Sequence, residues 1–173
     1  GLIGHLPGRT GDGAAVRPGD RRHQRLALPD RPHRDGQAGG GARGIGRQLA
    51  TDLLARGYRV VIGDLDQAAT DATAAELGAG ASAVRLDVTD RKNLAAVVAH
   101  VEATVGPIAL WINNAGIMPT GPFREQKMDV ARAISHINSA GVVEGTAAVL
   151  SGMLESHAGT IVNLASATGI KPL

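Results

Sequence analysis

The sequence predicts an α/β fold, a doubly wound parallel sheet whose pattern is incomplete. From Arg43 onward, short runs of β-branched residues alternate with helical patterns, an order typical of parallel strands joined by right-handed crossovers. A glycine-dense turn at residues 39–46 leads directly into the first helical pattern. Hydrophobic residues make up 43% of the 173-residue chain and charged residues 20%, which is typical of one soluble globular domain.

The composition argues against several classes of protein and site. Without cysteine the chain forms no disulfide, and its six histidines are spaced too far apart to suggest a metal site. No apolar run has the length of a membrane span, and the first residues lack the apolar block of a signal peptide. We therefore expect a cytoplasmic enzyme or binding protein with no metal ion and no membrane partner.

Residues 1–38 interrupt the α/β pattern. They hold four prolines and no apolar alternation, so we expect a disordered segment or the product of a displaced reading frame. The buried strand that should precede a glycine turn is then missing. Seven of the 18 lysine and arginine residues lie here, but without lysine or aromatic residues to stack on bases we expect no nucleic-acid binding. The predicted domain covers residues 39–173.

The glycine turn has the features of a phosphate cradle. Glycine lets a ligand approach the backbone without meeting a Cβ atom, and the helix that follows presents unpaired N–H groups and its positive dipole end. We expect Gly40, Gly44 and Gly46 to contact a pyrophosphate. In a chain with 24 glycines the cluster alone is weak evidence, so the assignment depends on the residues that follow.

The next acidic residue supports a dinucleotide. Residues 59–64 form a short β-branched strand that ends on Asp64, about 20 residues beyond the glycines. Asp64 can accept hydrogen bonds from the adenosine ribose hydroxyls and would repel a 2′-phosphate, which favours NAD over NADP. Arg43 could attract that phosphate and argues for NADP. We give Asp64 more weight because a carboxylate must lose its water on binding, whereas a loop arginine can turn to solvent.

The remaining elements follow in a regular order. Helices are expected at residues 45–56, 67–77, 91–105 and 128–154, and strands at residues 58–63, 82–86, 108–112 and 160–164. Asp90 should cap the third helix. Because ligands of such sheets bind at the carboxyl ends of strands, Asn113, Ser166 and the glycine turn should meet in one crevice.

From Gly40 to its end the chain resembles the short-chain dehydrogenase/reductases, whose fold is Rossmann-like. Three motifs carry the resemblance: Gly40-x-x-x-Gly44-x-Gly46, Asn113-Asn114-Ala115-Gly116, and Asn163-Leu164-Ala165-Ser166-Ala167-Thr168-Gly169. The resemblance implies catalytic roles for Ser166 and Asn138. It implies cofactor contacts for Gly40, Arg43, Gly44, Ile45, Gly46, Asp64, Asp87, Val88, Asn114, Ala115 and Gly116.

The resemblance also implies a reaction and an assembly. The cofactor would be NAD, with NADP less favoured, and hydride would pass between the nicotinamide and a small-molecule alcohol or ketone. The complete family member would be a homo-oligomer, in which the long helix at residues 128–154 packs against its symmetry mate.

The chain departs from the family at its proton donor. The family's Tyr-x-x-x-Lys pair is not among the 173 residues, since the one tyrosine is Tyr58 and the last lysine, Lys171, has no tyrosine four residues before it. A serine hydroxyl with no adjacent base is a poor proton donor, so Ser166 cannot replace the tyrosine. We therefore expect the truncated N-terminal part of a dehydrogenase, inactive as given.

Two alternatives of other classes remain open. The chain could be a dinucleotide-binding or subunit-interaction protein that performs no chemistry. It could also be a methyltransferase, because that class likewise places a glycine turn and an acidic residue at strand ends. The Asn113-Asn114-Ala115-Gly116 motif argues against the methyltransferase.

Overall fold

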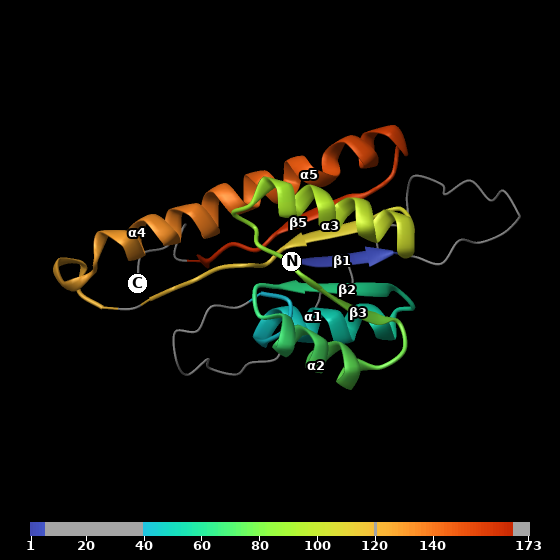
Figure 1. Cartoon of the computed structure of the whole chain (residues 1–173), viewed down its shortest axis with the longest axis horizontal. Helices are drawn as coiled ribbons and strands as arrows, with labels where there is room; N and C mark the ends of the chain where they lie inside the picture. The colour runs from blue at the N-terminus through green and yellow to red at the C-terminus, as the bar shows by residue number, and fades with distance from the viewer. Residues whose placement is uncertain (6–39, 120, 168–173) are drawn as a thin grey trace, which may run out of the picture.

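A computed structural model of the chain describes residues 1–5, 40–119 and 121–167, and shows one five-stranded sheet with helices on both faces (Figure 1). The strand order is β3-β2-β1-β4-β5. The strands are β1 (Leu2–His5), β2 (Arg59–Asp64), β3 (Ala81–Arg85), β4 (Leu110–Asn113) and β5 (Thr160–Asn163). The α-helices are α1 (Gly44–Ala55), α2 (Gln67–Leu77), α3 (Arg91–Thr104), α4 (Met128–Ser135) and α5 (Gly141–Glu155). The predicted Rossmann-like α/β class is confirmed.

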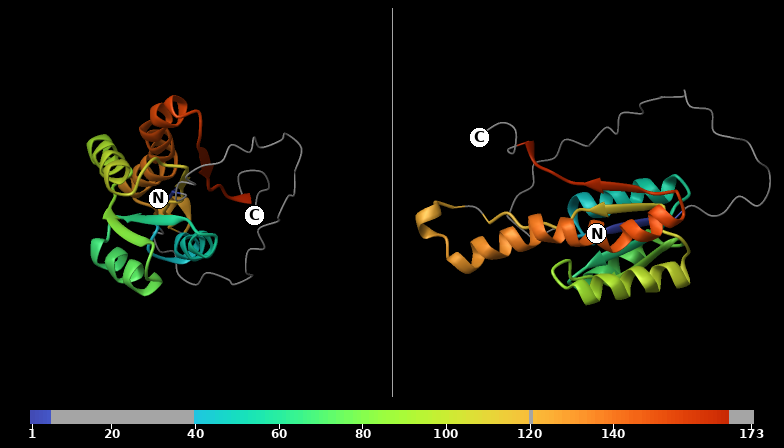
Figure 2. Two further views of the ribbon diagram at one scale, coloured as in Figure 1. Left: turned by 90° about the vertical axis from the view of Figure 1, so that its right-hand side faces the viewer. Right: turned by 90° about the horizontal axis from the view of Figure 1, so that it is seen from above.

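The sheet separates α1 and α2 from α3 and α5, as the left view of Figure 2 shows, and an apolar core lies on each side of it. On one face α1 and α2 cover a cluster that includes Val60, Ile62 and Ile112. On the other face α3 and α5 cover a cluster built around Leu94 and Trp111. Side chains of one strand alternate between the two faces, so the strands of the middle of the sheet contribute to both clusters.

The centre of the sheet contains a strand that the sequence did not lead us to expect. β1 lies between β2 and β4 and runs antiparallel to both, with Ile3 opposite Val61 on one side and Trp111 on the other. The expectations of a missing central strand and of an all-parallel sheet are therefore wrong. β2 pairs with β3, and β4 with β5, in parallel as expected. Residues 6–38, for which we expected disorder or a displaced reading frame, lie outside the described residues.

The side chains of β1 explain why this short segment fits. Leu2 is 0% exposed and joins the core beneath α1 and α2, whereas Ile3 is 1% exposed and joins the core beneath α3 and α5. Gly4 leaves room for a neighbour, since a Cβ atom there would lie 3.0 Å from the Tyr58 ring. Leu2 and Ile3 thus each fill the core on one face of the sheet, and the glycines on either side of them fit where neighbouring side chains lie close.

The helix boundaries follow local capping. Asp66 caps α2 by accepting from the Ala69 N–H at 3.0 Å, and Gly78 ends that helix at a φ of +79°. Asp90 caps α3 as predicted, by accepting from the backbone N–H groups of Lys92 and Asn93. The predicted apolar face of α3 is confirmed by its buried residues Leu94, Val97, Val98 and Val101.

The long helix expected at residues 128–154 is divided. α4 and α5 are joined by a π-helical turn at His136–Ala140, and α4 extends past the carboxyl ends of the strands (Figure 1). A π-turn inserts one residue into the helical repeat, and such turns are frequent at functional sites. None of the helices in the described ranges has the length and apolarity that a membrane crossing requires.

Candidate functional site

The glycine turn lies at the carboxyl end of the sheet, where its glycines make close contacts that a side chain would prevent. A Cβ atom on Gly40 would collide with the Asp64 carboxylate. A Cβ on Gly46 would collide with the Gly40 carbonyl oxygen and lie 2.8 Å from Asn114 Nδ2. Gly44, the first residue of α1, has a φ of +52°, in the left-handed region that favours glycine. The close packing around Gly40 and Gly46 and the backbone conformation of Gly44 therefore require glycine at these positions.

Three hydrogen bonds fix the turn to the domain. Asn114, directly after β4, donates from Nδ2 to the Gly40 carbonyl oxygen at 2.9 Å. The backbone N–H of Gly41 donates to the Gly63 carbonyl oxygen at 3.0 Å. On the other side the buried Thr73 hydroxyl donates to the Ala42 carbonyl oxygen at 2.9 Å, which joins the turn to α2. The turn is thus held between β2, β4 and α2.

Asp64 is half-buried at the end of β2 and faces this turn. Its Oδ2 accepts from the Ala42 N–H at 3.4 Å, and its Oδ1 accepts from the Asp66 N–H at 3.3 Å. Both bonds are long, so the carboxylate retains the capacity to accept stronger hydrogen bonds from a ligand. The structure therefore brings Asp64 and the glycine turn together, as their spacing predicted.

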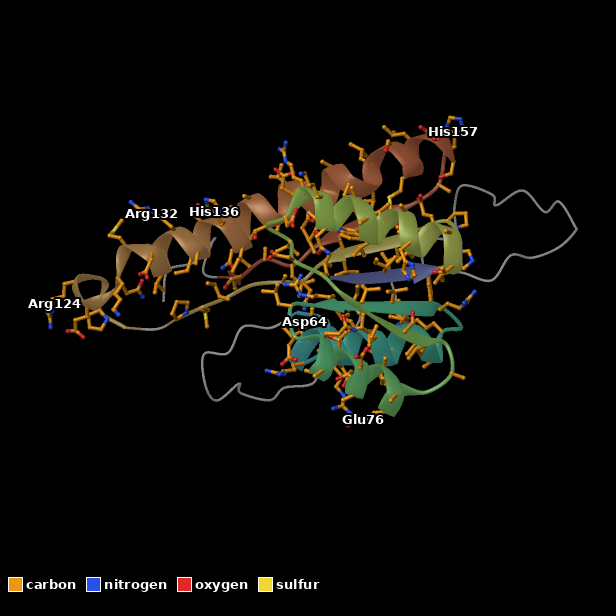
Figure 3. All side chains as sticks on the ribbon, viewed as in Figure 1. Asp64, Glu76, Arg124, Arg132, His136 and His157 are labelled. Atoms are coloured by element: carbon orange, nitrogen blue, oxygen red, sulfur yellow. The ribbon has the colours of Figure 1, made fainter. Side chains whose placement is uncertain are left out.

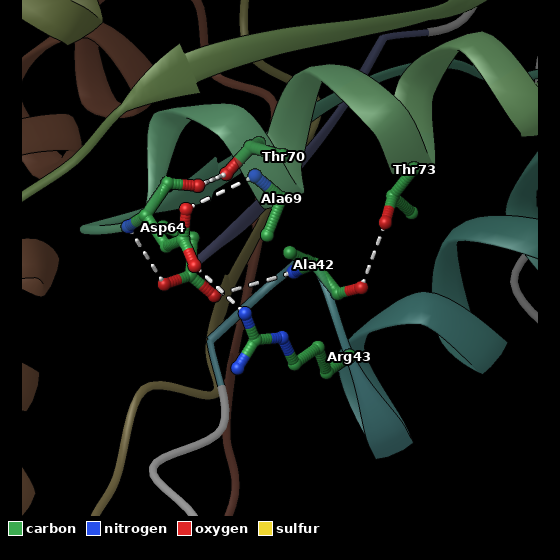
Figure 4. A network of polar contacts seen from close by, with 7 residues as sticks. Ala42, Arg43, Asp64, Ala69, Thr70 and Thr73 are labelled. Atoms are coloured by element: carbon green, nitrogen blue, oxygen red, sulfur yellow. Dashed lines mark hydrogen bonds and ion pairs between the residues drawn. The ribbon is translucent and has the colours of Figure 1, made fainter.

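We expected the Arg43 side chain to be able to turn to solvent, whereas in the structure it is half-exposed and forms an ion pair. Its Nη2 lies 2.7 Å from Oδ2 of Asp66, the residue that caps α2 (Figure 4). Sequence reasoning did not single out Asp66, although an aspartate two residues beyond a strand and directly before a helical pattern is a recognisable cap. It also missed Thr73, whose contact with the turn spans 31 residues and leaves no local signal.

Asp87 and Val88, for which the resemblance implied cofactor contacts, follow β3. Asp87 Oδ1 accepts from both the backbone N–H and the hydroxyl of Thr89, at 2.9 and 2.7 Å, which shapes the turn into α3. Val88 lies beside α5, where a Cβ atom on Gly141 would lie 2.8 Å from its Cγ2. A small pocket brings Val88 together with Asn114 and Ala115, and Gly1 also lines it.

Asn113 has a structural position. It is 7% exposed, and its Oδ1 accepts from the Trp111 ring N–H at 2.7 Å. Its Nδ2 donates to Asn163 Oδ1 at 2.8 Å and to Thr146 Oγ1 at 3.1 Å. Asn113 therefore connects β4 with β5 and α5, whereas its neighbour Asn114 is the one that reaches the glycine turn.

Asn138 lies in the π-turn and holds the strand-to-loop segment after β4. Its Nδ2 donates to the Ile117 carbonyl oxygen and its Oδ1 accepts from the Ile117 N–H, both at 2.9 Å. The side chain also lies beside Gly116, where a Cβ atom would be 3.5 Å from Asn138 Oδ1. Both polar atoms of Asn138 are thus engaged by backbone, so its direct effect is to position residues 116–117.

Ser166 is exposed just beyond the carboxyl end of β5. Because β5 pairs in parallel with β4, Ser166 and Asn114 follow neighbouring strands on the same edge of the sheet. Ile45, for which the resemblance implied a cofactor contact, is 46% exposed beside the glycine turn, whereas Ala50 of the same helix is 0% exposed.

Gly1, at the start of β1, reaches the same edge because β1 is antiparallel. Its amino group donates to the Gly63 carbonyl oxygen at 3.0 Å. In a polypeptide that begins at Gly1, burial lowers the pKa of this amino group to about 5, and the Asp64 carboxylate acts in the opposite direction.

The residues fit a dinucleotide and give no indication of a metal ion. The glycine turn offers a surface from which Cβ atoms are excluded, the N-terminus of α1 supplies positive dipole charge, and Asp64 supplies ribose acceptors. Across the parts of the chain that the structure describes, no three His, Asp or Glu side chains are grouped so that they could hold a metal.

Comparisons with known proteins agree with this arrangement. The sequence model of the short chain dehydrogenase family matches residues 39–173. The 2-(S)-hydroxypropyl-CoM dehydrogenase 3 of Xanthobacter autotrophicus is 35% identical over 134 residues, which are 76% of this chain and 52% of that protein. The 3-alpha-(or 20-beta)-hydroxysteroid dehydrogenase of Mycobacterium tuberculosis is also 35% identical, over 76% of this chain and 50% of that protein.

A solved structure agrees as well. The closed form of serine dehydrogenase complexed with NADP+ superposes with a TM-score of 0.72 at 27% identity, and covers 78% of this chain and 54% of that one. The chain spans about half the length of the curated relatives it matches. Because the family model matches residues 39–173 and a relative is 35% identical over 76% of the chain, the chain belongs to the short-chain dehydrogenase/reductase family of oxidoreductases.

Proposed function

We propose that residues 39–173 form a domain that binds NAD at the carboxyl end of the sheet, and that this domain serves hydride transfer between the nicotinamide and an alcohol or carbonyl substrate. One observation carries the proposal above the others: Gly40 lies against the Asp64 carboxylate and also accepts a hydrogen bond from Asn114. The family uses a nicotinamide dinucleotide, and a glycine turn beside an acidic strand end is the arrangement that holds its pyrophosphate and ribose.

In this proposal each part of the cofactor contacts a different group of residues around the glycine turn. The pyrophosphate lies on the backbone of Gly40, Gly44 and Gly46, close to Arg43 and Ile45. Asp64 accepts from the ribose hydroxyls, and residues 87–88 border the adenine. Asn114, Ala115 and Gly116 line the path toward the nicotinamide. The contacts outside the glycine turn use residues at the carboxyl ends of β2, β3 and β4.

Asp64 favours NAD in this site. A 2′-phosphate would place about two negative charges against a half-buried carboxylate, and Arg43, the cation of the described glycine turn, is already paired with Asp66 and so does not neutralise them. The solved relative with bound NADP+ shows that the family fold also accepts the phosphorylated cofactor. The preference therefore depends on these side chains and not on the fold.

For the reaction itself, bound nicotinamide supplies the hydride acceptor or donor. Ser166, at the end of β5, hydrogen-bonds the substrate oxygen and orients it. Asn138 maintains the position of residues 116–117 on the floor of the site through its two bonds to Ile117. A proton must also move to or from the substrate oxygen, and general acid–base groups contribute about 10²- to 10⁴-fold to such steps.

The proton does not come from Tyr58. This residue precedes β2 at the amino end of the sheet and packs in the core beneath α1 and α2. It is the single tyrosine of the 173 residues. This position of Tyr58 supports a second function for the 173-residue polypeptide taken alone. It would bind a dinucleotide without catalysing a reaction.

We propose that the substrate is a small-molecule alcohol or the corresponding carbonyl compound. The two curated relatives are named for 2-(S)-hydroxypropyl-CoM and for hydroxysteroids, so related chains are named for different alcohols. We further propose that the complete protein is a homo-oligomer through α5, which exposes Val143 (66%) and Leu154 (63%) on its outer face. Light scattering that finds monomer alone at micromolar concentration would contradict the assembly.

The cofactor assignment is tested by titrating NAD+ and NADP+ into the 173-residue chain and its Asp64→Ala variant. Loss of hydrogen bonds from a charged acceptor should weaken NAD+ binding by about 1.5 to 3 kcal/mol and leave NADP+ binding equal or stronger. Asp71→Ala, which alters a surface carboxylate in the middle of α2, is the control and should change neither. Unchanged binding of both cofactors to Asp64→Ala would refute the role of Asp64.

A further inference from the structure

We propose that Asp66 determines coenzyme selectivity by holding Arg43 in an ion pair and thereby keeping it from a 2′-phosphate. The inference rests on the proposed dinucleotide site and adds a second acidic residue to it. Asp64 would repel the phosphate directly, whereas Asp66 acts by occupying the arginine that would otherwise attract it.

Hydrogen bonds hold the backbone near both partners of the pair in place. Asp66 Oδ1 accepts from the Ala69 N–H at 3.0 Å as the cap of α2, which leaves Oδ2 to accept from Arg43 Nη2 at 2.7 Å. The Asp66 N–H in turn donates to Asp64 Oδ1 at 3.3 Å. Arg43 follows Ala42, whose carbonyl oxygen is bonded by Thr73. Neither partner therefore depends on a freely moving loop for its position.

The local charges explain the expected effect. Among the described residues, Asp64 and Asp66 place two negative charges beside one arginine, so this group of three side chains is net negative while the pair is intact. A 2′-phosphate adds further negative charge, and it gains Arg43 as a partner only if Arg43 leaves Asp66. The side chains of Arg43 and Asp66 are 52% and 49% exposed, so the ion pair is partly screened and can be broken by substitution without loss of a buried charge.

Asparagine at position 66 separates the two functions of the aspartate. Its Oδ1 can still accept from the Ala69 N–H, and asparagine is as good an N-cap as aspartate. It removes the negative charge that holds Arg43. The expected change is a roughly three- to tenfold shift of the Kd ratio toward NADP+, in the range of the free energy of an exposed ion pair.

The chain provides a matched control. Arg47 and Glu76 form a second ion pair between α1 and α2, also 2.7 Å long and with half-exposed side chains, 50% and 58%. Glu76 lies on the outer side of α2, well away from Asp64 (Figure 3). Glu76→Gln therefore breaks an equivalent bond without releasing a cation at the ribose end, and should leave the Kd ratio unchanged.

The test measures Kd for NAD+ and NADP+ by calorimetry on the 173-residue chain, at low and high salt. Asp66→Asn should shift the ratio toward NADP+, and the shift should shrink at high salt and disappear in Asp66→Asn combined with Arg43→Gln. A structural role alone would change both Kd values together and not their ratio.

The outcomes separate the two proposals. If the unchanged chain binds NAD+ but Asp66→Asn leaves the ratio as it was, the role of Asp66 is refuted and the proposed function stands. An equal shift in Glu76→Gln would also refute it. If the unchanged chain binds neither cofactor, both proposals fail.

Discussion

Replacing Leu2 by alanine should destabilise the domain strongly, although this residue stands at the start of a segment whose sequence resembles a disordered arm. Leu2 is 0% exposed and packs with Val60, Ile62 and Ile112 beneath α1 and α2. Truncation of a buried leucine to alanine costs about 2 to 5 kcal/mol, which combines the lost transfer free energy with the cavity left behind. Domains of this kind are stable by about 5 to 15 kcal/mol, so the loss is a large fraction of the total.

Urea unfolding followed by circular dichroism measures this effect. With a denaturant slope of about 2 kcal/mol per molar urea, the midpoint of Leu2→Ala should fall by about 1 to 2.5 M. Leu65→Ala is the matched control, because Leu65 is 52% exposed and its truncation should change the stability by no more than about 0.5 kcal/mol. If the two variants unfold at the same midpoint, β1 does not occupy the centre of the sheet.

Three further predictions follow from single features of the chain. Asp90→Ala removes two hydrogen bonds at the start of α3 and should lower stability by about 1 kcal/mol, whereas Asp90→Asn should change it little; equal losses in urea unfolding would contradict the capping role. In a polypeptide that begins at Gly1, burial lowers the pKa of the amino group from 8.0 to about 5 on folding. The free energy of unfolding is therefore highest above pH 8, where the amine is uncharged in both states, and it decreases as the pH falls toward 5. Unfolding near pH 6.5 should then take up about one proton, measured by calorimetry in two buffers, and zero uptake would refute the burial of the amine. The 173-residue chain should form NADH from none of a panel of secondary alcohols, because Tyr58 packs at the opposite end of the sheet; turnover above background would show that another group moves the proton.

The fold from residue 43 onward could be predicted because its signals are local. Apolar periodicity, the Asp90 cap and the glycine at the end of α2 each act within a few residues, and each is found close to where it was expected. β1 could not be predicted in this way. Leu2 and Ile3 are only two apolar residues between glycines, and what makes them a strand is the gap between β2 and β4, which comes from residues more than 50 positions away.

The same distinction applies to the site. The spacing from Gly40 to Asp64 and the motif at Asn114 predicted residues that do meet in the structure. The π-turn at Asn138 was read as part of one helix, because one inserted residue barely disturbs an apolar pattern of this length. The pairing of Arg43 with Asp66 depends on the direction of a flexible side chain, which no sequence pattern specifies.

The central claim is that a dinucleotide binds on the glycine turn at the carboxyl edge of the sheet, and amide hydrogen exchange with and without NAD+ tests it most directly. The opposite edge offers a suitable reference, since a groove there is lined by Arg59, Ser82 and His100. We predict that NAD+ slows exchange in peptides covering residues 40–46 and 114–116, and leaves peptides around His100 unchanged. Slowed exchange around His100 with an unprotected glycine turn would contradict the account.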